Sequence, residues 1–314
     1  MKTAIDVLQA LILILGAPLV SGIIARMKAR LQRRRGASIW RPYAEIFKLF
    51  RKEDLVPPTS SAVFRLAPIL LFGATAAVAA FIPVVQPSAV LGARGDFFLL
   101  VYLLAFGRFF LSLGALDGGS AFGGMGASRE ALISSLAEAP FLLGLVAVAI
   151  LASRADIAGI VAWTLQQSIF NISAVHILAF TSLGMVALAE TGRMPVDNPT
   201  THLELTMIHE GMVLEYSGPS LALVEWASAI KLHAMLALLI ALFCPWGMAR
   251  GAGSGWEIAL ALLLYCGKVT ALMILLSVIE SAVAKLRMYL VPDFLGVASA
   301  VSALAVIFTM WVKR

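Results

Sequence analysis

Charged residues are scarce in this sequence. Only 13% of its 314 residues are Asp, Glu, Lys or Arg, whereas 61% are hydrophobic and the mean hydropathy is +0.93. Soluble globular domains contain about a quarter charged residues and about half apolar residues. The composition therefore excludes an ordinary soluble domain and predicts a polytopic membrane protein.

Cysteine is also rare, since the chain has only Cys244 and Cys266, which lie in separate apolar segments without C-x-x-C spacing. A self-contained iron–sulfur site, which normally needs four cysteine ligands, is excluded. The sequence G-x-x-x-x-G-K-S/T is absent as well, so the chain carries no recognisable P-loop ATPase. The chain therefore shows no motif for binding a redox cofactor or hydrolysing ATP.

Long apolar runs predict an all-α membrane bundle of about eight transmembrane helices within a single integral membrane domain, residues 1–314. Each run has about 20 residues, enough to cross about 30 Å of hydrocarbon as a helix. Helices are expected because backbone polar groups in lipid must be satisfied within the protein. The expected spans are 3–25, 62–85, 96–116, 131–152, 171–189, 221–245, 256–279 and 293–311.

Basic residues concentrate in the first loop, 26–61, and include the run Arg33, Arg34 and Arg35. The positive-inside rule places this loop in the cytoplasm, and alternate crossing then places both termini on the outer side. The loops 117–130 (glycine-rich), 190–220 (acidic) and 280–292 become cytoplasmic. The formal charge of +6 thus indicates topology and not nucleic-acid binding. Within the basic loop, Tyr43–Arg51 predicts a short amphipathic helix on the membrane surface.

The acidic segment Glu190–Gly218 is the strongest candidate site. Pro195 and Pro199 interrupt the helix that leaves the membrane, and a second helix is expected from Thr200 to Tyr216. Such a helix would place Glu204 with Glu215, and His202 with His209, on common faces. Clustered carboxylates raise the pKa of at least one of them toward neutrality, which suits a proton carrier.

From the residues alone, docking of a partner protein remains as plausible for this segment as proton or quinone chemistry. A metal site is disfavoured because the His and Glu spacing does not match H-E-x-x-H. The glycine-rich stretch from Ala115 to Glu130, with Asp117 and Arg129, favours a packed re-entrant turn; its spacing matches no phosphate-binding motif.

Five ionisable residues are expected inside the spans, and they predict a polar core, because such groups usually face the bundle interior. They are Arg108, Glu138, Glu225, Lys231 and Lys268. Glu138, about two turns into its span, is the best candidate for an intramembrane proton carrier. Arg108 is more readily explained as a salt-bridge partner.

Several motifs together resemble one family. E-x-x-R-x-P-x-D at 190–197, E-Y-S-G at 215–218 and the basic stretch 33–53 are similar to subunit 1 of respiratory complex I, the membrane subunit that anchors the peripheral arm. L-D-G-G-S-A-F-G-G-M-G-A-S-R-E at 116–130 and the stretch 197–210 resemble more closely the membrane subunits of energy-converting nickel–iron hydrogenases and formate hydrogenlyase.

The resemblance implies a prokaryotic inner-membrane subunit that is not catalytic alone. It would hold no cofactor, while other subunits would carry a nickel–iron centre and iron–sulfur clusters. Implied partners are hydrogenase-type large and small subunits, an iron–sulfur protein and antiporter-like membrane subunits. The implied proton path, for H⁺ or Na⁺, comprises Glu190, Asp197, Glu204, Glu210 and Glu215, continued by Glu138. Supporting or docking roles fall to Arg33, Arg34, Arg35, Arg108, Asp117, Arg129, Glu130, Arg193, His202, His209, Tyr216, Glu225, Lys231 and Lys268.

Three alternatives remain open from the sequence. The first is a quinone-site subunit of a complex I-type enzyme, whose chamber would lie between the first span and the acidic loop. The second is a stand-alone ion-coupled secondary transporter. The third is a passive scaffold, in which acidic substitutions would alter assembly only.

Overall fold

Eleven α-helices make up nearly all of the described structure. The computed structural model describes residues 2–92, 95–168, 173–197, 207–249 and 255–313. The helices are α1 (Lys2–Leu31), α2 (Arg41–Phe50), α3 (Ala62–Phe81), α4 (Phe97–Asp117), α5 (Ala121–Ala152), α6 (Ile157–Gln166), α7 (Ala174–Glu190), α8 (His209–Val213), α9 (Gly218–Phe243), α10 (Gly255–Ala282) and α11 (Val291–Val312), with a 3₁₀ turn at Met288–Leu290.

Seven of the described helices are long and apolar enough to cross a bilayer: α1, α3, α4, α5, α9, α10 and the combined Met288–Val312 segment. Helix α7 has 17 residues, which is the lower limit for a span. The ten-residue α6 is too short to cross and was not predicted. The all-α membrane bundle is therefore confirmed, and the predicted eight spans fall within the seven to nine candidates.

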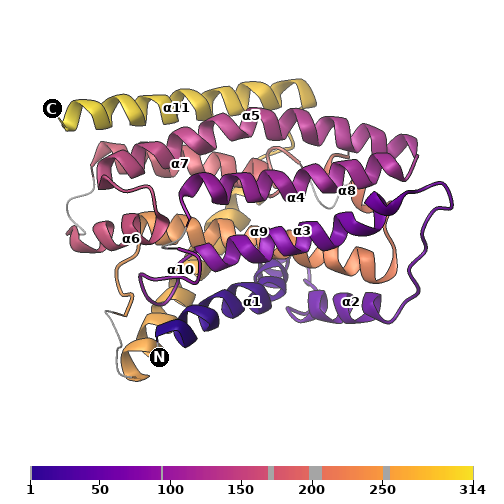
Figure 1. Ribbon diagram of the computed structural model, residues 1–314, viewed down its shortest axis with the longest axis horizontal. Helices are drawn as coiled ribbons and strands as arrows, with labels where there is room; N and C mark the ends of the chain where they lie inside the picture. The colour runs from indigo at the N-terminus through magenta and orange to yellow at the C-terminus, as the bar shows by residue number, and fades with distance from the viewer. Residues whose placement is uncertain (1, 93–94, 169–172, 198–206, 250–254, 314) are drawn as a thin grey trace.

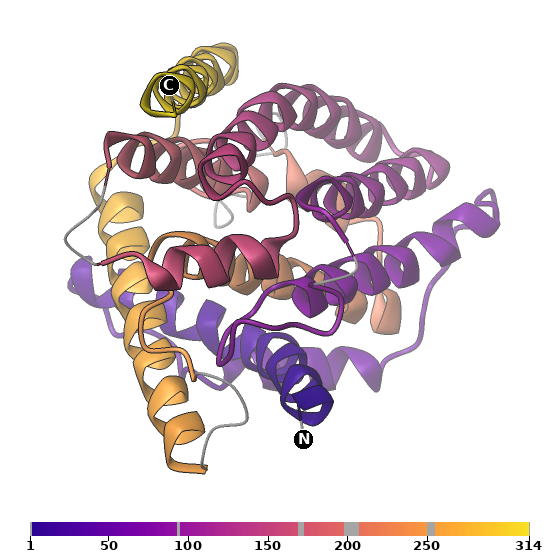
Figure 2. The same ribbon diagram turned by 60° about the vertical axis from the view of Figure 1, so that its left-hand side comes forward.

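Helix α9 forms the centre of the bundle. It is the most buried of the long helices, with 78% of its most apolar window inside the protein, compared with 22% for α10 and 28% for the last helix. Helices α1, α3 and α7 all pack against it, and Figure 2 shows α9 enclosed while α10 and α11 lie at the periphery. Side chains on different faces of α9 therefore reach different neighbours.

The two ends of the bundle differ in character. Both termini lie at one end, and α2 and α8 lie toward the other (Figure 1). That second end also receives the C-terminal ends of α1, α7 and α10 and the N-terminal end of α9, and it is called the charged end below. The common location of the termini agrees with an even number of crossings, and which side of the membrane they face stays a prediction.

Helix α2 confirms the predicted amphipathic segment. Ile46 is buried toward the protein, whereas Phe47 is 67% exposed and Trp40, just before the helix, is 61% exposed. The charged residues Lys48 and Arg51 are exposed on a further face. This distribution suits a helix lying at the membrane surface, where aromatic side chains are enriched.

The prediction of a glycine-rich loop at residues 117–130 is wrong for most of that range. Helix α5 already begins at Ala121, after the hydroxyl of Ser120 accepts a hydrogen bond from Gly123 N at 2.9 Å. The glycines permit close packing: a Cβ at Gly126 would lie 2.9 Å from the carbonyl oxygen of Ile208. Gly126 therefore allows helix contact with the segment around α8, whereas Gly119, with a φ of +74°, does lie in the turn before α5.

The other predicted loops also shorten. Helix α1 continues to Leu31 and α10 continues to Ala282, so both extend past the expected membrane boundary. In the acidic segment, the helix expected from Thr200 to Tyr216 is seen only as the five-residue α8; residues 198–206 lie outside the described structure. The charged groups thus sit on helix ends more than in free loops.

Candidate functional site

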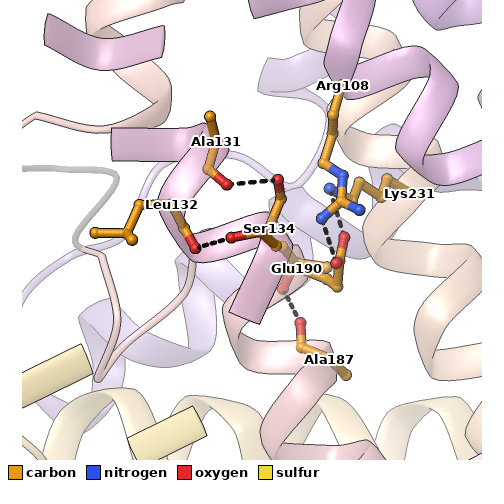
Figure 3. A network of polar contacts seen from close by, with 9 residues as sticks. Arg108, Ala131, Leu132, Ser134, Ala187, Glu190 and Lys231 are labelled. Atoms are coloured by element: carbon orange, nitrogen blue, oxygen red, sulfur yellow. Dashed lines mark hydrogen bonds and ion pairs between the residues drawn. The ribbon is translucent and has the colours of Figure 1, made fainter. Parts of the chain in front are cut away.

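A buried carboxylate lies between two cations in the middle of the bundle. Glu190, at the end of α7, forms ion pairs with Arg108 of α4 and with Lys231 of α9, the latter at 3.1 Å. Figure 3 shows the Glu190 carboxylate pointing toward both cations. The Glu190 side chain is fully buried, and those of Arg108 and Lys231 are only 8% and 12% exposed. We call these three residues the central triad.

The central triad lies well inside the helical bundle, away from the ends of α4 and α9 at the charged end. At a rise of 1.5 Å per residue, Lys231 lies about 20 Å along α9 from Gly218, and Arg108 lies about 13 Å along α4 from Asp117. Ionised groups at such depth are costly unless they are paired. The pairing explains how three ionisable residues are tolerated there, and it shows Arg108 in the salt bridge that the sequence favoured.

A second ion-pair centre lies nearer the charged end. Glu280, which is buried near the end of α10, pairs with Lys28 of α1 at 3.2 Å and with Arg193 at 3.1 Å. Asp197 is also buried and pairs with Lys285 at 2.7 Å. The charged residues of the E-x-x-R-x-P-x-D motif therefore belong to separate ion pairs. Its glutamate is part of the central triad, while its arginine pairs with Glu280 of α10 and its aspartate pairs with Lys285, just after α10.

Three neighbouring cavities lie between α2 at the surface and the central triad. The first, the α2 cavity of about 280 Å³, lies between α1, α2 and α9 and is lined by exposed Glu45 and Lys48. The second, the polar cavity of about 150 Å³, shares Glu225 and Ser21 with it. Because they share lining residues, the two cavities are neighbours along α9.

The third cavity reaches the triad itself. This deep cavity of about 30 Å³ is lined by Arg108, Glu190 and Lys231, together with Glu130 and His209. His209 also lines the polar cavity, as do Thr191, Gly192 and Ser228. A series of adjoining cavities therefore extends from α2, past Glu225 and His209, to a buried carboxylate. Such an arrangement can admit water and pass protons between titratable groups.

Comparison with known proteins agrees with this architecture. The family model described as NADH dehydrogenase matches residues 4–311. The chain is 35% identical to hydrogenase-4 component C of Escherichia coli (strain K12), over 96% of this chain and 93% of the relative. It is 34% identical to formate hydrogenlyase subunit 4 of the same organism, over 93% and 94%.

More distant similarity covers less of the sequence or the fold alone. The H subunit of NADH-quinone oxidoreductase from Geobacillus thermodenitrificans (strain NG80-2) is 33% identical over 68% of this chain and 62% of its own length. This chain belongs to the NADH dehydrogenase family of complex I subunit 1. It is also similar in fold to a chain of the archaeal membrane-bound sulfane sulfur reductase, with a TM-score of 0.83, 23% identity and coverage of 97% and 99%.

Family membership confirms the resemblance that the motifs indicated: this is a multi-pass membrane protein of the complex I-like class that includes hydrogenase and formate hydrogenlyase membrane subunits.

The predicted residues are distributed unevenly over the family fold. Glu190, Arg108, Lys231, Glu130 and His209 meet around the deep cavity. Glu210 and Asp197 line the polar cavity with Glu225.

Several other predicted residues hold helices together at the charged end. Asp117 accepts hydrogen bonds from the backbone N of Ser61 at 2.7 Å and of Phe64 at 3.2 Å, at the start of α3. Glu215 accepts a hydrogen bond from the hydroxyl of Ser120. Arg129 donates to the carbonyl of Met207 at 2.9 Å. These contacts give the three residues an evident structural role.

Tyr216 is buried beside two of these carboxylates. Its ring stacks on Phe64 with centroids 4.5 Å apart. Burial raises the pKa of the Tyr216 phenol, and the nearby charges of Asp117 and Glu215 raise it further. The sign is clear: Tyr216 stays protonated and neutral across the physiological range, so it does not titrate as a proton carrier would.

The contact between α4 and Tyr216 leads to a stability prediction. A Cβ at Gly114 would lie 2.0 Å from the Tyr216 hydroxyl oxygen and 2.8 Å from Ala67 Cβ. We expect Gly114→Ala to lower the free energy of unfolding by about 1–3 kcal/mol, the usual cost of overpacking. Thermal unfolding of the purified complex measures it. Gly73→Ala on α3 is the matched control, since nothing lies within 4 Å of its added Cβ; equal melting temperatures would contradict the prediction.

Three predicted assignments lie away from the cavities. Arg33, Arg34 and Arg35 are exposed at the charged end, where a soluble partner can reach them. Glu138 is half-buried on α5, lines none of the three cavities, and has no hydrogen bond or ion pair with any residue the structure describes. Lys268 donates to the carbonyl of Cys244 at 2.7 Å at the opposite end of the bundle, so it does not belong to the polar core. His202 and Glu204 lie outside the described residues.

Sequence reasoning missed the ion pairs of Glu280. The residue was placed at the edge of the loop 280–292, but it is buried near the end of α10 and binds cations from two other segments. Lys28 and Lys285 lie within the predicted loops 26–61 and 280–292, and no ion pair was predicted for either of them. The available signal was the position of Glu280 directly after a long apolar run, where an unpaired carboxylate would be costly.

Proposed function

We propose that this chain is the membrane-anchoring subunit of an energy-converting hydrogenase or a formate-hydrogenlyase-like complex, and that it links electron transfer in a soluble arm to translocation of H⁺ or Na⁺. The observation that carries the proposal is the series of adjoining cavities that ends at the central triad. A passive scaffold would account for the ion pairs of Glu190 with Arg108 and Lys231, but not for the series of cavities that reaches them.

The charged end provides the docking surface in this proposal. The exposed basic run Arg33–Arg35 adjoins the end of α1, whose Lys28 pairs with Glu280. A redox module seated there would lie over the mouth of the α2 cavity. With only two cysteines in the chain, the iron–sulfur clusters and the nickel–iron centre are proposed to belong to the partner subunits.

The first experiment is to purify the tagged protein from its native membrane in mild detergent and identify the associated proteins by mass spectrometry. We expect hydrogenase-type large and small subunits, an iron–sulfur protein and antiporter-like membrane subunits in stoichiometric amounts. NADH-dehydrogenase modules would move the assignment to quinone reduction. A single chain that transports ions in liposomes would contradict the subunit proposal.

Ion coupling needs a separate measurement. In sealed vesicles that contain the whole complex, turnover of the soluble arm is expected to build a pH gradient, or a sodium gradient if Na⁺ is the coupling ion. Protonophores collapse the first and leave the second, which distinguishes the two ions. Turnover with neither gradient would leave the docking role and overturn the coupling role.

The α2 cavity also supports a second candidate, a quinone site. It lies between α1, α2 and α9, next to the place expected from the sequence: the polar cavity is the one that Ser21 of the first span lines together with Asp197 and Glu210 of the acidic loop. The volume of the α2 cavity, about 280 Å³, lies at the small end of ligand pockets, which run from about 300 to 1,000 Å³. Inhibition of the intact complex by quinone-site inhibitors would favour this candidate, and insensitivity would favour the hydrogenase-type function.

A further inference from the structure

Helix α1 contains a proline in its interior. The backbone carbonyl that consequently lacks its helical donor accepts a hydrogen bond from a side chain of α9 instead. Pro18 has no backbone N–H, so it cannot donate to the carbonyl of Ile14 four residues earlier. Trp226 of α9 donates its indole N–H to that carbonyl at 3.0 Å. An interruption within one membrane helix is thus satisfied by a side chain of the central helix.

The two neighbouring carbonyls of α1 also accept side-chain hydrogen bonds. Leu13 O lies 3.0 Å from Nδ1 of His233 on α9, and Leu15 O accepts from the hydroxyl of Tyr43 on α2 at 2.5 Å. Gly16 leaves room for the imidazole, since a Cβ there would already lie 3.4 Å from His233 Cε1. We call the carbonyls of residues 13–15 and their three donors the α1 clamp.

The chemistry of the clamp fixes the state of His233. A carbonyl oxygen only accepts, so Nδ1 must carry the proton, and Nε2 is free to accept from the Tyr265 hydroxyl at 2.9 Å. His233 and Tyr265 are 3% and 4% exposed. The imidazole is therefore held as one neutral tautomer between α1 and α10, which suits a structural connector better than a proton carrier.

The spacing along α9 shows what the clamp controls. Trp226 and His233 are seven residues apart and so lie on one face of the helix. Glu225 directly precedes Trp226 and lines the α2 and polar cavities, while Lys231 lies between the two clamp residues and reaches Glu190 on another side. Two fixed points on one face set both the rotation and the axial position of α9.

We infer that Trp226 and His233 are positioning residues, which hold α9 on the interrupted turn of α1 so that Glu225 faces the cavities while Lys231 reaches Glu190. The inference rests on the proposed function, because that function is what assigns Glu225 and Lys231 to the ion path. The geometry of α9 itself is measurable without that function.

The first test replaces each donor in the assembled complex. Trp226→Phe keeps an aromatic ring and removes the N–H. We expect it to lower the ion-to-electron ratio and to change the maleimide-labelling rate of a Glu225→Cys reporter by about tenfold, since displacements near 1 Å have large effects at such sites. Trp246→Phe is the matched control, because Trp246 also donates to a backbone carbonyl, that of Gln167, at 2.9 Å; it should alter neither measurement.

A second pair isolates the bond from His233. His233→Asn and His233→Leu both lose the contact with Tyr265, but only the asparagine amide can still donate toward Leu13. The asparagine variant should keep most of the coupling and the labelling rate, and the leucine variant should lose them by about tenfold. Equal behaviour of the two variants would show that the bond to Leu13 does not position α9.

A rescue experiment separates positioning from simple satisfaction of a carbonyl. Pro18→Ala restores the helical donor for Ile14, so Pro18→Ala combined with Trp226→Phe should recover the yield of assembled complex. Positioning predicts that labelling and coupling stay altered in the double variant. Recovery of all three would overturn the inference. A labelling change with no coupling change in any variant would uphold the clamp and count against the proposed ion path instead.

Discussion

Glu190→Gln is expected to abolish ion-coupled turnover and to lower the free energy of unfolding by about 3–5 kcal/mol, the usual cost of removing one partner from a buried ion pair. The neutral amide would leave Arg108 and Lys231 facing each other in the protein interior without their anion. Thermal unfolding of the purified complex and gradient formation in sealed vesicles measure the two effects.

The controls for Glu190→Gln separate charge from folding. Glu257→Gln changes an exposed carboxylate at the start of α10 and should alter neither stability nor coupling. Glu190→Gln combined with Lys231→Met removes one of the two cations and should recover part of the stability, while coupling stays absent. Normal melting and normal gradients in Glu190→Gln alone would show that the central triad serves neither purpose.

The sequence was informative wherever a local pattern determined the structure. Apolar runs of spanning length gave the long helices, because lipid demands a continuous apolar surface and internal hydrogen bonds. Helix α2 was predicted from a local pattern too, since apolar Ile46 and Phe47 stand beside charged Lys48 as in an amphipathic helix. The short helix α6 was not predicted, because ten residues are too few to distinguish a buried helix from a loop within an apolar chain.

The site was predicted as a group of residues and not as a set of partners. Glu190 and Arg108 are 82 positions apart, and no periodicity relates residues on different helices. The same limit applies to α5. Gly126 was interpreted as a turn residue, because its close contact with Ile208 depends on the tertiary structure and leaves no local sequence pattern. Clustered carboxylates were expected to repel one another, but the structure pairs Glu190, Asp197 and Glu280 with cations from distant parts of the sequence.

Glu225 combines two properties that no residue of the central triad has. It lines both the α2 cavity and the polar cavity, and its side chain is exposed to them. Among the described residues it forms no ion pair, so its charge does not hold helices together. Its position at the junction of the two cavities makes it the carboxylate through which an ion entering beside α2 would reach His209 and the triad.

We therefore expect Glu225→Gln to reduce ion-coupled turnover by roughly 10²-fold, the lower range for loss of a proton-transferring group, without changing the melting temperature. Electron transfer within the soluble arm, assayed with an artificial acceptor, should be unaffected, because the proposed function gives this chain the ion path and leaves electron transfer to the soluble arm. Glu225→Asp retains a carboxylate and should keep partial coupling, whereas Glu45→Gln, at the exposed mouth of the α2 cavity, should have a smaller effect. A full ion-to-electron ratio in Glu225→Gln would place the path elsewhere, since it would mean that ions reach Glu190 without passing Glu225, the carboxylate that lines both cavities among the described residues.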